Sequence, residues 1–119
     1  GQIWEMATAA AHYDIDNLTV MVDWNGIQID GYNKDVMDVG DLKAKWEAFG
    51  WHTVTVDGHD MPAIHAALNQ ARAVKGRPQV ILCKTILGHP ISFMSDKPGW
   101  HGVAPNDEQT QVALAELGA

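Results

Sequence analysis

Three short apolar segments alternate with helical segments along this chain, and that alternation limits the folds open to it. Residues 18–22, 52–56 and 78–83 are rich in apolar and β-branched side chains, as buried strands are. Segments with helical spacing precede the first strand, separate the others and follow the last. The order α-β-α-β-α-β-α predicts an α/β fold, in which a parallel sheet with right-handed crossovers carries helices on both faces.

Four segments are predicted as helices: residues 3–13, 42–49, 61–74 and 107–117. Three of them follow a residue type that commonly caps helix N-termini: Asp41, Asp60 and Asn106. Glycines at 50 and 76 stand where the second and third helices should end. Residues 26–40 and 84–105 are left as loops, and the second is long enough to predict a functional role.

The first predicted helix is rich in alanine, so it should approach a neighbour closely. One possibility is that it lies at a contact with another copy of the chain, which would also cover Trp4 and would make the protein a homo-oligomer. The other possibility is that it packs on the sheet inside the domain. We expect the first, so the chain alone should expose an apolar face on this helix and self-associate.

Length and composition bound the class of protein. The chain has 119 residues, of which 46% are hydrophobic, so it can form one modest domain with one core. Its net charge of −7 excludes a broad nucleic-acid-binding surface, and no apolar run approaches the roughly 20 residues of a membrane helix. The single cysteine, Cys83, fits a reducing compartment. We therefore expect a cytoplasmic protein that binds neither nucleic acid nor membrane.

The first predicted strand stops at Val22 and gives way at residues 23–26 to polar side chains and a glycine. In parallel sheets, ligands bind beyond the carboxyl ends of the strands. The side-chain oxygen of Asn25 and the backbone carbonyl of Ile27 are ligands that Mg²⁺ accepts, and Gly26 permits a tight bend between them. The same residues also fit an ordinary Asn-Gly turn without a metal.

The second candidate lies in the long loop, where His101 follows Trp100 and precedes a glycine. A histidine at this place can donate to a phosphate oxygen or carry a proton, or it can be an ordinary loop residue beside an aromatic anchor. The other histidines show no zinc spacing, and the chain contains neither GxGxxG nor GxxxxGK[ST]. Nicotinamide and P-loop nucleotide sites therefore have no support.

Three blocks, taken in order, are specific to one family. The runs GQIWEMATAAAHYDIDNLTVMVDWNGIQIDG, KWEAFGWHTVTVDGHD and WHGVAP resemble the transketolases in their N-terminal, thiamine-diphosphate-binding domain. The chain is similar to the form that many bacteria encode as a separate N-terminal subunit. The resemblance covers residues 1–119, so it implies one partial domain of such an enzyme.

The resemblance implies a set of ligands and a reaction. Asn25 and the Ile27 carbonyl match the family positions that hold Mg²⁺ against the diphosphate, and His101 matches the histidine that reaches the diphosphate. The cofactors would be thiamine diphosphate and Mg²⁺. The reaction would be the transfer of a two-carbon ketol unit between sugar phosphates.

This chain also departs from the family pattern. The Gly-Asp-Gly that opens the thiamine-diphosphate motif, with its metal-binding Asp, would precede Gly1, and the glutamate that activates the cofactor belongs to another domain. Residues 85–90 read Thr-Ile-Leu-Gly-His-Pro, where two family lysines are lost and a proline is gained. We therefore expect a fragment that is inactive alone and that works with the remaining domains or a companion subunit. The alternatives are an inactive binding or scaffold module, or a related thiamine-diphosphate enzyme with other substrates.

Overall fold

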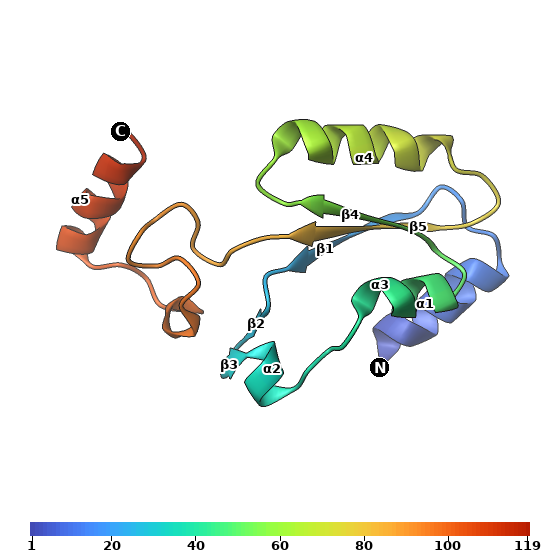
Figure 1. The fold of residues 1–119 in the computed structure, drawn as a ribbon, viewed down its shortest axis with the longest axis horizontal. Coiled ribbons are helices and arrows are strands. Elements are labelled where there is room, and N and C mark those ends of the chain that lie inside the picture. The colour runs from blue at the N-terminus through green and yellow to red at the C-terminus, as the bar shows by residue number, and fades with distance from the viewer. The chain divides into compact units, whose positions relative to one another are not determined.

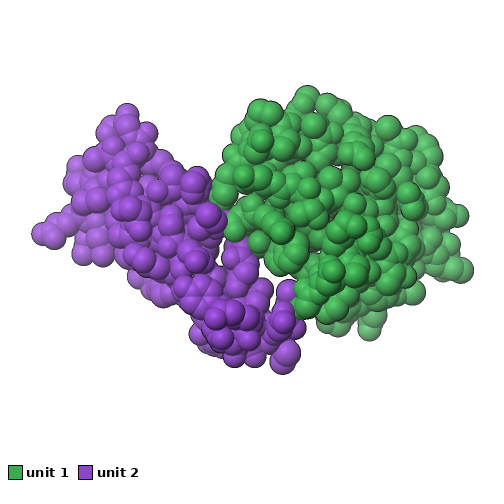
Figure 2. Space-filling model, in the orientation of Figure 1, with its two compact units in different colours: residues 1–24, 40–85 green, residues 25–39, 86–119 purple.

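The computed structural model describes residues 1–119, which form two compact units (Figure 2). Unit 1 comprises Gly1–Trp24 and Gly40–Thr85, and unit 2 comprises Asn25–Val39 and Ile86–Ala119. Each of the two predicted loops therefore lies almost wholly in unit 2, while the predicted strands and the first three helices lie in unit 1.

Unit 1 is a parallel α/β unit (Figure 1). Its elements are α1 (Gln2–His12), β1 (Thr19–Trp24), α3 (Leu42–Ala48), β4 (His52–Asp57), α4 (Met61–Ala73) and β5 (Gln79–Lys84). The strands pair in parallel in the order β1-β5-β4, so the last strand of the chain is the central one. The predicted α/β class is confirmed. Asp41 and Asp60 cap α3 and α4 as predicted, because their carboxylates accept from the amides of Ala44 and Ala63.

The core of unit 1 is built around both faces of β5 (Figure 1). Val80 and Leu82 point to the face that α1 and α3 cover, where Trp46 is also buried. Ile81 and Cys83 point to the other face, against α4. Alternation along one central strand thus explains why residues 80–83 are all apolar.

The helix α1 packs inside unit 1, so the expectation that its alanine-rich face is left for a second copy of the chain is wrong. Ala7 and Ala10 are buried, and the indole Nε1 of Trp51 donates to the Ala7 carbonyl oxygen at 2.9 Å. Trp4 stacks on Phe49 with 5.3 Å between ring centroids. The small residues of α1 therefore face the core that holds Trp46 and Trp51, and Phe49 covers part of Trp4 within the same unit.

Two expectations for the first strand are wrong. It does not stop at Val22, because Asp23 and Trp24 continue the parallel ladder opposite Cys83 and Lys84. Nor is it covered on both faces: β1 is an edge strand, and Met21 remains 48% exposed. The polar residue Asp23 fits the ladder because the end of an edge strand is open to water.

Unit 2 contains a small hairpin, β2 (Ile27–Gln28) and β3 (Gly31–Tyr32), followed by α2 (Asn33–Val36). Its second segment forms the 3₁₀ helix η1 (Pro98–Trp100) and α5 (Asp107–Glu116), whose cap, Asn106, forms the reciprocal bonds of a capping box. The prediction of plain loops was therefore incomplete. No helix in the chain combines the length and the apolar character that spanning a membrane requires.

Candidate functional site

All three predicted site residues, Asn25, Ile27 and His101, belong to unit 2. Asn25 comes directly after the last residue of β1, at the carboxyl end of a parallel strand, and Ile27 opens β2. β2 pairs with β3, and η1, which immediately precedes His101, lies beside β3. The hydroxyl of Tyr32 donates to the Asp96 carbonyl at 2.8 Å and so ties the two segments together.

Asn25 forms a tight turn with its own backbone. Its side-chain oxygen Oδ1 accepts a hydrogen bond from the Ile27 amide at 2.9 Å, and Gly26 between them has a φ of +75°. This is the conformation that only glycine adopts readily, so the Asn-Gly pair sets the bend.

The Ile27 carbonyl lies on the same side of β2 as the Asn25 oxygen. The Asn33 amide donates to the Gly26 carbonyl at 2.9 Å, and Ile27 stands opposite Tyr32 in the antiparallel register. Ile27 and Tyr32 are therefore a non-hydrogen-bonded pair, in which both backbone groups of Ile27 point away from β3. The amide of Ile27 meets the Asn25 oxygen there, and its carbonyl points to the same side.

Reasoning from the sequence missed Asn33, which lies beside this turn. Its side-chain oxygen is buried and has no hydrogen-bond partner, although its backbone amide is bonded to Gly26. A buried acceptor without a partner is uncommon in native structures. No motif in the sequence around Asn33 predicts a buried oxygen without a partner, because this depends on how the hairpin folds.

His101 lies at the end of η1 with its side chain exposed and without a hydrogen-bond partner in the chain. Its backbone amide bonds the Pro98 carbonyl at 2.9 Å. The preceding Trp100 donates from Nε1 to the Phe93 carbonyl at 3.0 Å, and its ring meets that of Phe93 edge-on. The aromatic neighbour thus anchors the loop and leaves the imidazole available to a ligand.

The carboxyl edge of the sheet in unit 1 carries a polar pair rather than a nucleophile. The hydroxyl of Thr85 donates to the Asp23 carboxylate. Burial raises the pKa of the neighbouring Cys83 thiol, and the negative charge of Asp23 raises it further. Cys83 is therefore a thiol at neutral pH and a poor nucleophile. The chain holds no cluster of three or more His, Cys, Asp or Glu side chains placed to bind a metal.

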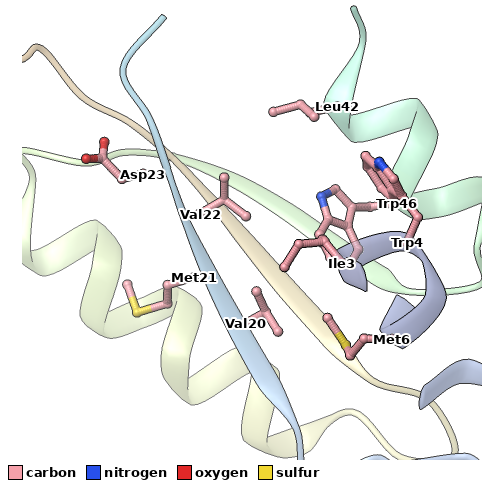
Figure 3. A pocket seen from close by; sticks show the side chains of 9 residues that line it. All are labelled: Ile3, Trp4, Met6, Val20, Met21, Val22, Asp23, Leu42 and Trp46. Carbon is pink, nitrogen blue, oxygen red and sulfur yellow. The ribbon is translucent and has the colours of Figure 1, made fainter. Parts of the chain in front are cut away.

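An apolar cleft of about 370 Å³ runs along the free edge of β1 in unit 1 (Figure 3). Val20 and Val22 point from β1 toward Trp46, whereas Met21 and Asp23 point to the other side of the strand. The cleft is lined by nine side chains: Ile3, Trp4, Met6, Val20, Met21, Val22, Asp23, Leu42 and Trp46. Asp23 is the only one that carries a charge, so the cleft is suited to packing rather than to chemistry.

A parallel sheet followed by an oxygen-bearing turn after one of its strands is typical of α/β domains whose ligands bind beyond the strand ends. The chain belongs to the transketolase family: residues 1–119 match the family described as "Transketolase, thiamine diphosphate binding domain". The resemblance seen in the sequence is thereby confirmed.

Curated proteins that the chain resembles are named as transketolase subunits. The chain is 40% identical over 117 residues to the 6-deoxy-6-sulfo-D-fructose transketolase subunit SqwG of Clostridium sp., and the alignment covers 98% of this chain and 42% of that protein. It is 36% identical to one of the subunits of the apulose-4-phosphate transketolase of Actinobacillus succinogenes, with the same two coverages. The chain thus spans about two fifths of the length of these curated relatives.

Solved transketolases share the fold. The crystal structure of transketolase from Campylobacter jejuni matches with a TM-score of 0.89 at 26% identity, covering 97% of this chain and 18% of that one. A transketolase from Pichia stipitis, solved in complex with a sugar phosphate, matches with a TM-score of 0.88 at 29% identity, covering 96% of this chain and 17% of that chain. Almost the whole chain therefore superposes on one part of a larger enzyme.

Proposed function

We propose that this chain is part of a thiamine-diphosphate-dependent transketolase that transfers a two-carbon ketol unit between sugar phosphates. The family match over residues 1–119 carries the proposal. The relatives named as transketolase subunits support it, since they are similar to the chain along nearly its whole length.

The residues of the Asn25 turn fit a magnesium ion. Mg²⁺ prefers oxygen ligands and commonly takes only one or two from protein, with phosphate and water completing the octahedron. The Asn25 side chain and the Ile27 carbonyl are such oxygens, and both lie on one side of β2. In the proposal they hold Mg²⁺, and the ion holds the cofactor's diphosphate.

His101 is proposed to donate a hydrogen bond to the diphosphate. Its exposed imidazole is free of partners in the chain, and the segment that carries it is tied to β3 by Tyr32. Thiamine diphosphate, when bound, supplies the electron sink that the two-carbon transfer needs. The contribution of this chain is to hold and orient the anionic end of the cofactor, and we assign it no acid or base in the reaction.

A companion part of the enzyme is needed in this proposal. The chain offers two oxygen ligands and no further metal-binding cluster, so other metal ligands and the substrate groups must come from elsewhere. The apolar cleft beside β1 supports this, because Ile3 and Met21 are 57% and 48% exposed there. We propose that the partner is a companion subunit or the remaining transketolase domains, in a cytoplasmic enzyme that assembles as a homo-oligomer.

A ketol-transfer assay tests the proposal. The 119-residue chain should give no turnover alone with a ketose phosphate, an aldose phosphate, thiamine diphosphate and Mg²⁺. Turnover should appear when the companion part is added and should disappear when a chelator removes Mg²⁺. An assembled complex that binds the cofactor without turnover would favour the alternative of an inactive binding module.

A further inference from the structure

A polar pocket of about 230 Å³ lies at the amino-terminal end of the sheet in unit 1. Its lining residues come from the α1–β1 turn, the end of α4 and the first residues of β1 and β5: Asp16, Asn17, Thr19, Arg72, Lys75 and Gln79. The two connections lie together at this end of the sheet (Figure 1). Trp24 is five steps along β1 from Thr19, so the pocket is about 17 Å from the carboxyl edge.

The floor of the pocket is a fixed carboxamide. Gln79 is only 1% exposed, and its Nε2 donates to the Asp16 carbonyl at 2.9 Å. Its Oε1 accepts from the Thr19 hydroxyl at 3.1 Å. A buried amide held at both ends is a preorganised surface, because no side-chain freedom is lost when a ligand arrives.

Two cations stand over this floor without partners. Arg72 lies in the last turn of α4 and Lys75 two residues beyond the helix, and neither side chain forms an ion pair or a hydrogen bond within the chain. The chain has 15 acidic and 8 basic residues. These two cations therefore lack an ion pair although acidic residues outnumber basic ones. The one acid in the lining, Asp16, accepts from the Gly76 amide at 3.1 Å.

The polar row at this end continues to His52. Gln79 is in register with Thr19 on one side and His52 on the other, so the three side chains share the α4 face of the sheet. The His52 Nε2 atom is buried and has no hydrogen-bond partner. At its amino-terminal end, the α4 face of the sheet therefore carries polar groups, and not all of them have hydrogen-bond partners within the chain.

We propose that this pocket binds a small phosphorylated polyol, with the phosphate on Arg72 and Lys75 and the hydroxyls on Asp16 and Asn17. A guanidinium and an ammonium together match a phosphate dianion, and Arg can bind two of its oxygens at once. The carboxylate of Asp16 would repel a bare anion but accepts from a hydroxyl, which selects a ligand that carries both groups. The volume lies below the roughly 300–1,000 Å³ of drug-sized ligands, so the ligand is small.

This site is separate from the proposed cofactor turn and stands or falls independently of the proposed ketol transfer. Because it lies at the opposite end of β1 from the carboxyl edge, an occupant would act on the fold or on regulation rather than on the reacting atoms. Its occupant would brace the α1–β1 turn against the end of α4, which Asp16 and Gly76 already connect.

The test is an NMR titration of the ¹⁵N-labelled 119-residue protein with glycerol 3-phosphate, inorganic phosphate and glycerol as separate probes. We expect glycerol 3-phosphate to shift the Gln79 side-chain amide and the Gly76 backbone amide and to bind about tenfold more tightly than inorganic phosphate. Glycerol should shift neither. The double variant Arg72→Gln, Lys75→Gln should bind glycerol 3-phosphate at least about tenfold more weakly.

Arg77→Gln is the matched control, because Arg77 is exposed on the same connection but does not line the pocket. It should bind as the unchanged protein does. Circular dichroism should show that both variants are folded, since all three substituted side chains are exposed. Equal losses in the control, equal affinity for phosphate and glycerol 3-phosphate, or the same shifts with sodium chloride at matched ionic strength would each overturn the proposal.

Discussion

The carboxylate of Glu116 holds Ser92 with both of its oxygens. The Ser92 backbone amide donates to Oε2 at 2.7 Å, and the Ser92 hydroxyl donates to Oε1. Within unit 2 this clamp joins the last residue of α5 to the long loop that precedes it. Since α5 buries none of its residues, the clamp is a main source of its positioning.

This clamp predicts a pH dependence. The hydrogen bonds from the Ser92 side chain and backbone lower the pKa of Glu116, so its ionised form favours the folded state. The stabilisation is complete above the pKa of glutamate in an unfolded chain, roughly 4.3, and is lost as the pH falls through the lower folded value. The Ser92 amide signal, followed by NMR into the acid range, should move in that window.

Glu116→Gln should abolish the pH dependence of the Ser92 signal. Glu108→Gln, on the same helix but outside the clamp, should leave it unchanged. A Ser92 signal that titrates identically in the Glu116→Gln variant would show that another group is responsible.

Substitutions of Trp51 should lower the stability of unit 1 to different extents. It is 2% exposed, its ring meets Trp46 at 4.7 Å, and it donates to the Ala7 carbonyl. Trp51→Phe removes mainly the hydrogen bond and should cost about 1–2 kcal/mol, whereas Trp51→Ala also leaves a cavity and should cost about 3–5 kcal/mol. Urea unfolding followed by circular dichroism measures both, and equal losses would mean that the packing of the ring adds nothing beyond the hydrogen bond.

Two glycines with the same backbone conformation should respond differently to alanine. Gly76 has φ +71° and open space around it, so Gly76→Ala should cost only the left-handed strain, about 1 kcal/mol. Gly88 has φ +74°, and an added Cβ would lie 2.8 Å from the Met94 backbone, so Gly88→Ala should cost about 2–4 kcal/mol. Free energies of unfolding from urea titrations test the difference, which a cost for Gly88→Ala no larger than for Gly76→Ala would contradict.

Local signals account for the parts of the fold that the sequence predicts well. Asp41, Asp60 and Asn106 cap their helices through bonds to amides three residues ahead, which depend on sequence spacing alone. The strand order is different, because the central place of β5 depends on pairing with strands far away in the sequence. The β2–β3 hairpin escapes prediction because strands of two residues show no alternation.

The candidate site also has one part that the local sequence predicts and another part that it does not. The Asn25 turn is visible as Asn-Gly, and both interpretations of it, the plain turn and the metal ligand, use the same side-chain oxygen. Local sequence could not place the Ile27 carbonyl, whose direction depends on the register with Tyr32. Nor could it find the buried oxygen of Asn33, which depends on how the hairpin closes.

Asn25 should affect cofactor binding in the assembled enzyme. Asn25→Ala removes a proposed Mg²⁺ ligand and should weaken Mg²⁺-dependent binding of thiamine diphosphate by roughly 2–3 kcal/mol, the cost of losing a partner to a charged group. Asn25→Asp keeps an oxygen that can accept from the Ile27 amide, so it serves as the control for loss of the turn. Calorimetry measures both, and unchanged affinity in the alanine variant would refute the metal assignment.

The apolar cleft beside β1 predicts that the chain alone self-associates at micromolar concentration. Ile3 is 57% exposed and lines the cleft together with Met21. Met21 belongs to β1, whose outer edge has no neighbouring strand in the sheet. Ile3→Lys should place a charge in that contact and shift sedimentation toward monomer.

Ala10 is not a useful probe, since it is buried inside unit 1 and a charge there would disturb the fold. Ile29→Lys is the matched control: Ile29 is 75% exposed but lies in unit 2, so it should leave association unchanged. A clean monomer for the unchanged chain, or equal effects of the two lysines, would show that this cleft is not where copies meet.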